Sequence, residues 1–197
     1  MEFIKKNFAV LLAFILPIAL IVIVALSTYL PSLFLKTDYN FIYATCSDSG
    51  HNSYYYCPGY LKQKYTVVNG KLVINEVDVT KLMDLYGRPY PYENQSYSSR
   101  IFLHDTKKNE SKEITSEEAQ ALNLSSLVTS PDGVSLSSGY DNDTNFFFIF
   151  GNGRSYGYDL IKGKSRKKLN LIYDSEYYNY QDNFQFLGWV LPGTNKN

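Results

Sequence analysis

The chain has 197 residues, with 19 basic and 19 acidic side chains, so its formal net charge is +0. This balance gives no electrostatic reason to bind nucleic acid, and no nucleic-acid partner is expected. About 160 residues follow the first 35, which is enough for one domain with its own core. The 19 tyrosines and 12 phenylalanines suit strands and half-buried faces. An alternative interpretation is that some of them form a surface that stacks on carbohydrate or peptide.

The first predicted element is an apolar helix. Residues Phe8 to Leu26 carry no charge, and at ~1.5 Å per residue they span about 28 Å, close to the ~30 Å hydrocarbon core of a bilayer. We therefore expect a cytoplasmic N-terminus at 1–7 and a transmembrane signal-anchor helix at 8–30, with the lipid bilayer as its partner. Pro31 is expected to end or bend this helix and to begin a juxtamembrane linker at 31–39.

The charges around the apolar run predict its orientation. Lys5 and Lys6 precede it, so the positive-inside rule places the N-terminus in the cytoplasm and the C-terminal domain outside it, at the cell membrane. A cleaved signal peptide is an alternative, since Ala25-Leu26-Ser27 resembles a cleavage site, although the apolar run exceeds the usual ~7–15 residues. A pilin-like N-terminal helix is a third reading, but the usual glycine cleavage site and following glutamate are missing.

The two cysteines agree with an external location. Cys46 and Cys57 are the only ones in the chain, and a disulfide between them would persist in an oxidising compartment. Free thiols remain an alternative, as does a metal site made of Cys46, His51 and Cys57 with Asp48 nearby. That set lacks the second pair of ligands that structural zinc requires, so no metal or other cofactor is expected.

A mostly antiparallel β domain is expected over residues 40–193, followed by a disordered tail at 194–197. Its strongest local signal is the hairpin 65–74, in which Asn69-Gly70 supplies the positive φ angles of a type I′ turn. Two short helices are expected, one at 80–86 with Thr80 as N-cap and one at 116–122, where Thr115 and Glu118 have the spacing of a capping box. Other predicted strands cover residues 40–45, 100–105, 111–115, 134–138, 145–150, 154–160 and 168–173.

Part of this meander resembles a known repeat. Ser130-Pro131-Asp132-Gly133 is followed by strands that end in Tyr158-Asp159-Leu160 and then Gly163-Lys164. This stretch resembles one blade of a WD40-like (TolB-type) β-propeller, and residues 186–193 resemble the opening of a next blade. The resemblance covers roughly residues 99–193. Because a propeller usually needs four or more blades of about 40 residues, it implies blade-like hairpins within a small β domain.

The candidate binding and catalytic residues are few. No nucleophile elbow, P-loop or zinc-protease motif is present. His104 is interpreted as a strand-face residue next to Phe102, and the loop 141–145 as a turn with only a partial calcium-loop pattern. The densest charge cluster consists of Lys162, Lys164, Arg166, Lys167 and Lys168. It is interpreted either as a surface that binds an anionic glycan, lipid or protein, or as a charged hairpin that keeps a sheet edge from pairing with other strands.

Together these features suggest a single-pass membrane protein whose external β domain binds or scaffolds an envelope protein or glycan without catalysis. An alternative function of a different class is that of a glycosidase-like hydrolase that acts on an envelope polymer. Its acid and base would be carboxylates such as Asp132, Asp141 and Asp143. A third is an accessory subunit of a membrane complex, held through its helix.

Overall fold

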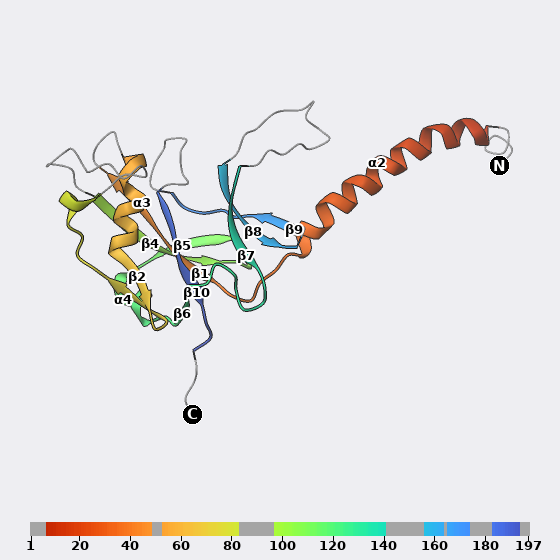
Figure 1. Ribbon diagram of the computed structural model, residues 1–197. Coiled ribbons are helices and arrows are strands. Elements are labelled where there is room, and N and C mark those ends of the chain that lie inside the picture. The colour runs from red at the N-terminus through yellow and green to blue at the C-terminus, as the bar shows by residue number, and fades with distance from the viewer. Residues whose placement is uncertain are drawn as a thin grey trace.

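Strand β1 is the centre of the fold, which Figure 1 shows for the computed structural model. The structure describes residues 7–48, 53–82, 97–140, 156–163, 165–173 and 183–193. In chain order the elements are α2 (Phe8–Phe34), β1 (Phe41–Asp48), α3 (Ser53–Lys64), β2 (Tyr65–Val68), β3 (Lys71–Ile74), the 3-10 turn η1 (Val79–Lys81), β4 (Tyr97–Asp105), β5 (Glu110–Ile114), α4 (Ser116–Ala121), β6 (Leu124–Ser125), β7 (Ser135–Tyr140), β8 (Tyr156–Lys162), β9 (Ser165–Lys168) and β10 (Phe184–Val190).

The main sheet has the strand order β5-β4-β1-β10-β6, and all its neighbours are antiparallel. β10, the final strand, therefore lies between the first strand and the short β6 (Figure 1). Two further sheets are separate from it in strand pairing: the hairpin β2-β3 and the three-stranded meander β7-β8-β9. The described residues thus form open antiparallel sheets with a few short helices beside α2, which confirms the predicted mostly-β class.

β1 is buried on both faces because its side chains alternate across the sheet. Ile42, Ala44 and Cys46 point into one cluster of apolar side chains. Phe41 and Tyr43 point into a second cluster on the other face. All five are fully buried, so the sheet is the middle layer of a three-layer domain rather than a wall with one solvated side.

The first face is covered by α3, the hairpin β2-β3 and α4. α3 contributes Cys57, Tyr60 and Leu61 to the cluster, which places one side of that helix on the sheet. The helix contains Pro58, and its composition alone does not favour a helix. Packing and the cysteine link to β1 supply the stability that helical propensity does not.

The second face is covered by the β7-β8-β9 sheet and the chain after β9. Tyr43 joins the two layers, because its hydroxyl accepts from the Ile172 N–H at 2.9 Å and lies 3.3 Å from the Ile172 carbonyl. Trp189 is completely buried, packs edge-on to Phe41 at 5.4 Å and donates its indole N–H to the Val128 carbonyl. Burial raises the pKa of the Tyr43 hydroxyl above its usual value, so the hydroxyl that connects the two layers stays protonated.

Local sequence signals located several elements correctly. The hairpin turn has φ of 50° at Asn69 and 74° at Gly70, as the predicted turn requires. The second short helix begins at Ser116, and Thr115 and Glu118 form the full capping box. The strands expected near 40–45, 100–105, 111–115, 134–138 and 154–160 appear as β1, β4, β5, β7 and β8.

Other expectations were wrong. The helix predicted to start at Thr80 is one 3-10 turn, and its N-cap is Asp78, whose carboxylate accepts the Thr80 N–H. The strand expected over 168–173 instead occupies Ser165–Lys168. α3 was not predicted at all. Some predicted features lie outside the described residues, namely the strand 145–150, the loop 141–145, residues 83–86, Lys164, His51 and the tail 194–197.

α2 runs for 27 residues and projects away from the β domain (Figure 1). It continues past Pro31 to Phe34, so Pro31 does not end the helix; the alternative, that it bends the helix, stays a prediction, as does the linker at 31–39. A proline removes only one intrahelical N–H donor, and a helix can continue beyond it. A search of the described residues identifies no helix with the length and apolarity needed to cross a membrane.

Candidate functional site

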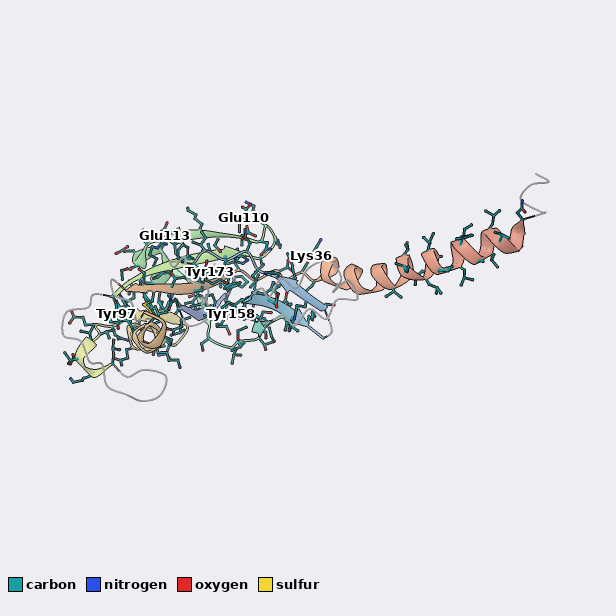
Figure 2. The ribbon with its side chains drawn as sticks, turned by 90° about the horizontal axis from the view of Figure 1, so that it is seen from above. Lys36, Tyr97, Glu110, Glu113, Tyr158 and Tyr173 are labelled. Atoms are coloured by element: carbon teal, nitrogen blue, oxygen red, sulfur yellow. A yellow bond between two sulfur atoms is a disulfide. The ribbon has the colours of Figure 1, made fainter. Side chains whose placement is uncertain are left out.

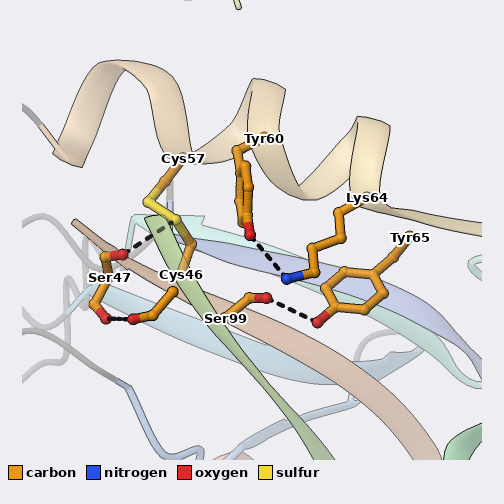
Figure 3. The surroundings of a disulfide bond; sticks show 8 residues. Cys46, Ser47, Cys57, Tyr60, Lys64, Tyr65 and Ser99 are labelled. Atoms are coloured by element: carbon orange, nitrogen blue, oxygen red, sulfur yellow. Dashed lines mark hydrogen bonds between the residues drawn. A yellow bond between two sulfur atoms is a disulfide. The ribbon is translucent and has the colours of Figure 1, made fainter. Parts of the chain in front are cut away.

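The Cys46–Cys57 disulfide predicted from the sequence is present and fixes α3 to β1 (Figure 3). Both cysteines are completely buried, and the described residues include no free cysteine. Burial makes this a structural link rather than an accessible redox pair. It holds the start of α3 over the sheet, and the next two turns of the helix then form one wall of a groove.

An open groove of about 650 Å³ lies between α3, the end of β3 and the start of β4. Its walls combine apolar side chains with two tyrosines, one ammonium, one amide and one carboxylate: Tyr60, Lys64, Ile74, Asn75, Glu76, Val77, Val79 and Tyr97. A mixture of apolar surface and a few polar groups is one feature of ligand-binding sites, although this groove is more open than most of them.

Two tyrosines and a lysine organise the wall that α3 contributes. The rings of Tyr60 and Tyr97 stack with centroids 5.0 Å apart. The Lys64 ammonium donates to the Tyr60 hydroxyl at 2.8 Å and lies 5.1 Å from the centre of that ring (Figure 3). It also lies 5.8 Å from the ring of Tyr65. These contacts restrain one positive charge against an aromatic surface, which suits binding of a polar or anionic group on an otherwise apolar ligand.

The opposite wall is held by Asn75. Its backbone N–H donates to the Lys64 carbonyl at 2.8 Å, and its side-chain amide donates to the Gln63 carbonyl at 3.0 Å. Both bonds tie the end of β3 to the end of α3. The two walls of the groove are therefore hydrogen-bonded to each other at this end.

The predicted basic cluster lies on β8 and β9, but its members differ in surroundings. The Lys162 ammonium donates to the Asp132 carbonyl at 2.8 Å, and the Lys167 ammonium donates to the Thr106 carbonyl at 3.2 Å. Arg166 lies 3.6 Å from the buried Asp159 carboxylate. Lys168 is exposed. Four of the five predicted residues are thus on one hairpin, which forms a charged sheet edge.

Asp132, predicted as one acid of a hydrolase, is instead bound to the chain that follows α2. Its carboxylate accepts from the Thr37 hydroxyl at 3.0 Å, from the Asp38 N–H at 3.2 Å and from the Ser130 hydroxyl. Burial alone would raise the pKa of Asp132, but these hydrogen bonds outweigh it and lower the pKa. These three bonds attach Asp132 to the linker and to its own turn; Asp141 and Asp143 lie outside the described residues, so the hydrolase alternative stays a prediction.

His104 is buried as well, on the same face as Phe102, as predicted. Its cross-strand partner is Phe41, whose ring is 4.9 Å away, and its Nδ1 is 2.9 Å from the Ser111 hydroxyl. Burial lowers the pKa of His104 to about 4, although Asn109 and Asp105 act in the opposite direction. The ring is therefore neutral at physiological pH and belongs to the core rather than to a site.

Sequence reasoning did not identify the groove. Tyr60 and Lys64 are one helical turn apart, a spacing that indicates a shared face only once α3 is known to be a helix. Tyr97 is 37 positions after Tyr60 and carries no local signal of the contact. Among the described residues, no three His, Cys, Asp or Glu side chains gather as a metal site would require.

Comparison with protein-family models, with curated proteins and with solved structures gives no match. The resemblance to propeller blades therefore stays a prediction. In the described residues, β7, β8 and β9 form a sheet of their own, whereas β4, β5 and β10 belong to the main sheet.

Proposed function

We propose that this chain is a single-pass membrane protein with its N-terminus inside, whose external β domain binds an envelope protein or glycan. The uncharged run from Phe8 to Leu26 supports the anchor. So does the exposure of its large side chains, for example 59 % for Phe8 and 70 % for Phe14, because apolar groups without a partner in the chain need an apolar environment. No helix of the described residues has the length and apolarity needed to span a membrane, so the anchor is proposed from the sequence.

The disulfide supports an external domain, because such bonds persist in oxidising compartments. The placement of the groove supports binding. Tyr97, which lines it, lies at the end of the domain far from α2, whereas Lys36 lies where α2 meets the domain (Figure 2). If α2 is in the bilayer, the groove faces away from it. This separation is the observation on which the binding function mainly rests.

Topology can be tested with introduced cysteines, because Cys46 and Cys57 are buried and bridged. Lys112→Cys places a thiol on an exposed position of β5, and Glu2→Cys places one before the apolar run. We expect a membrane-impermeant maleimide to label Lys112→Cys on intact cells and Glu2→Cys only after lysis. The protein should stay in the membrane after alkaline extraction and keep residues 1–35 in its mass. Labelling of Lys112→Cys only after lysis would contradict the external location.

Binding at the groove can be tested in the same cells with a photo-crosslinking amino acid. At Glu76, an exposed position of the groove, we expect a crosslinked product of higher mass. At Lys112, which is also exposed and lies on β5, we expect none. Equal crosslinking at both positions, or none at either, would argue against the groove as the binding surface.

A further inference from the structure

The chain between α2 and the β domain is packed, not loose. Leu35 is buried in the second core cluster and Thr37 is 3 % exposed. The Asp132 carboxylate binds Thr37 and the Asp38 N–H, and the Thr106 hydroxyl donates to the Thr37 and Tyr39 carbonyls. The β domain is therefore firmly attached to residues 35–39, which directly follow α2. Its surface around these residues stays close to the end of that helix.

Three separate segments meet at this position. β9 lies beside α2, as Figure 1 shows at the domain end of that helix. The turn 106–109 contacts the linker through the ion pair Lys107–Asp38, at 2.9 Å. The same turn joins β9, because the Asn109 amide donates to the Lys168 carbonyl at 3.0 Å.

The exposed charges of these segments are mostly positive. Lys162 of β8 lies with them, because its ammonium donates to the carbonyl of Asp132, the residue whose carboxylate binds the linker. We call the following six cations the juxtahelical basic surface: Lys36, Lys107, Lys108, Lys162, Arg166 and Lys168.

The acids nearby offset this surface only in part. Asp38 and Glu110 are exposed. Asp105 accepts two backbone N–H groups of its own turn, the half-buried Asp132 accepts from Thr37, Ser130 and the Asp38 N–H, and Asp159 is buried beside Arg166. Exposed cations therefore outnumber exposed acids six to two around the end of α2.

We propose that the juxtahelical basic surface binds the anionic headgroups of phospholipids in the bilayer that holds α2. The inference rests on the anchor part of the proposed function. Of the anionic partners that the sequence leaves open, lipid is favoured by position: a surface fixed beside the end of a membrane helix lies at headgroup level, within the ~8 Å over which charges act at physiological salt. Binding there would hold the domain against the membrane and turn the groove outward.

The test measures lipid selectivity of the full chain in phosphatidylcholine vesicles that carry traces of spin-labelled lipid. The immobilised fraction is compared for spin-labelled phosphatidylglycerol and spin-labelled phosphatidylcholine. We expect a preference for phosphatidylglycerol that disappears in high salt and falls several-fold in Lys162→Gln/Lys168→Gln, since each basic residue near a membrane surface changes the affinity about fivefold. The matched control, Lys62→Gln/Lys81→Gln, removes two exposed cations from α3 and η1 and should keep the preference.

Equal immobilisation of the two lipids by the wild-type chain, or an equal loss in both double variants, would overturn the proposal. No immobilised lipid of either kind would show that α2 does not enter the bilayer, and the anchor would fail with it. If instead a soluble sulfated glycan binds the wild-type chain and not Lys162→Gln/Lys168→Gln, while lipid selectivity is absent, the surface serves a glycan and the lipid assignment is wrong.

Discussion

Reducing the Cys46–Cys57 disulfide tests how far the fold depends on holding α3 to β1. The bond closes a loop with a sequence separation of 11. In the chain-entropy treatment a loop of this length stabilises the folded state by about 3 kcal/mol at 25 °C. Both sulfurs lie among buried apolar side chains, and reduced thiols pack there as small apolar groups. The loss on reduction should therefore be close to the entropic value alone.

The assay is urea unfolding of the full chain in detergent micelles, with and without reductant. Trp189 is the single tryptophan and is completely buried, so its fluorescence reports the sheet and not α3 directly. With a slope of about 2 kcal/mol per molar urea, 3 kcal/mol shifts the midpoint down by roughly 1.5 M. The variant Cys46→Ala/Cys57→Ala should fall at least as far, because it also removes the two sulfurs from the core.

An unchanged midpoint after verified reduction would refute the reasoning, because packing alone would then hold α3. A lower midpoint with a clearly smaller slope would refute it differently. In that case α3 and the sheet would no longer unfold together, and the loop-entropy value would not apply to the sheet.

Three further predictions concern buried contacts. The folded chain holds the pKa of His104 at about 4, below its usual 6.5. The free energy of unfolding should therefore be highest above pH 6.5 and fall by about 3 kcal/mol as the pH drops to 4. In urea titrations at several pH values, His104→Phe should make the free energy of unfolding less dependent on pH. Asp132→Ala leaves the Thr37 hydroxyl without that acceptor and should cost about 2 kcal/mol, which Asp132→Asn should partly recover in the same unfolding assay. Gly188→Ala would place a Cβ 2.8 Å from the Ser125 carbonyl oxygen and should destabilise the chain by about 1–3 kcal/mol, whereas Gly193→Ala, which has open space, should have no effect on the urea midpoint.

The features that were predicted correctly share one property: their signals lie within a few residues of one another. The Asn69-Gly70 turn and the Thr115–Glu118 capping box each satisfy their backbone groups locally. α3 shows the opposite case. Its run of tyrosines followed by Cys57 and Pro58 has no helical signal of its own, and the helix depends on the sheet beneath it.

The candidate surfaces divide in the same way. The sequence alone predicted the Cys46–Cys57 pair and contains the cluster of cations that lies on β8 and β9. Only the tertiary structure decided that Tyr60 stacks on Tyr97, and that the basic hairpin lies beside α2. Bringing together residues so far apart in the chain costs conformational entropy. Burial of the whole sheet offsets that cost, and nothing in the sequence next to each residue indicates the contact. That is why contacts between distant segments appear in the fold and not in the local sequence.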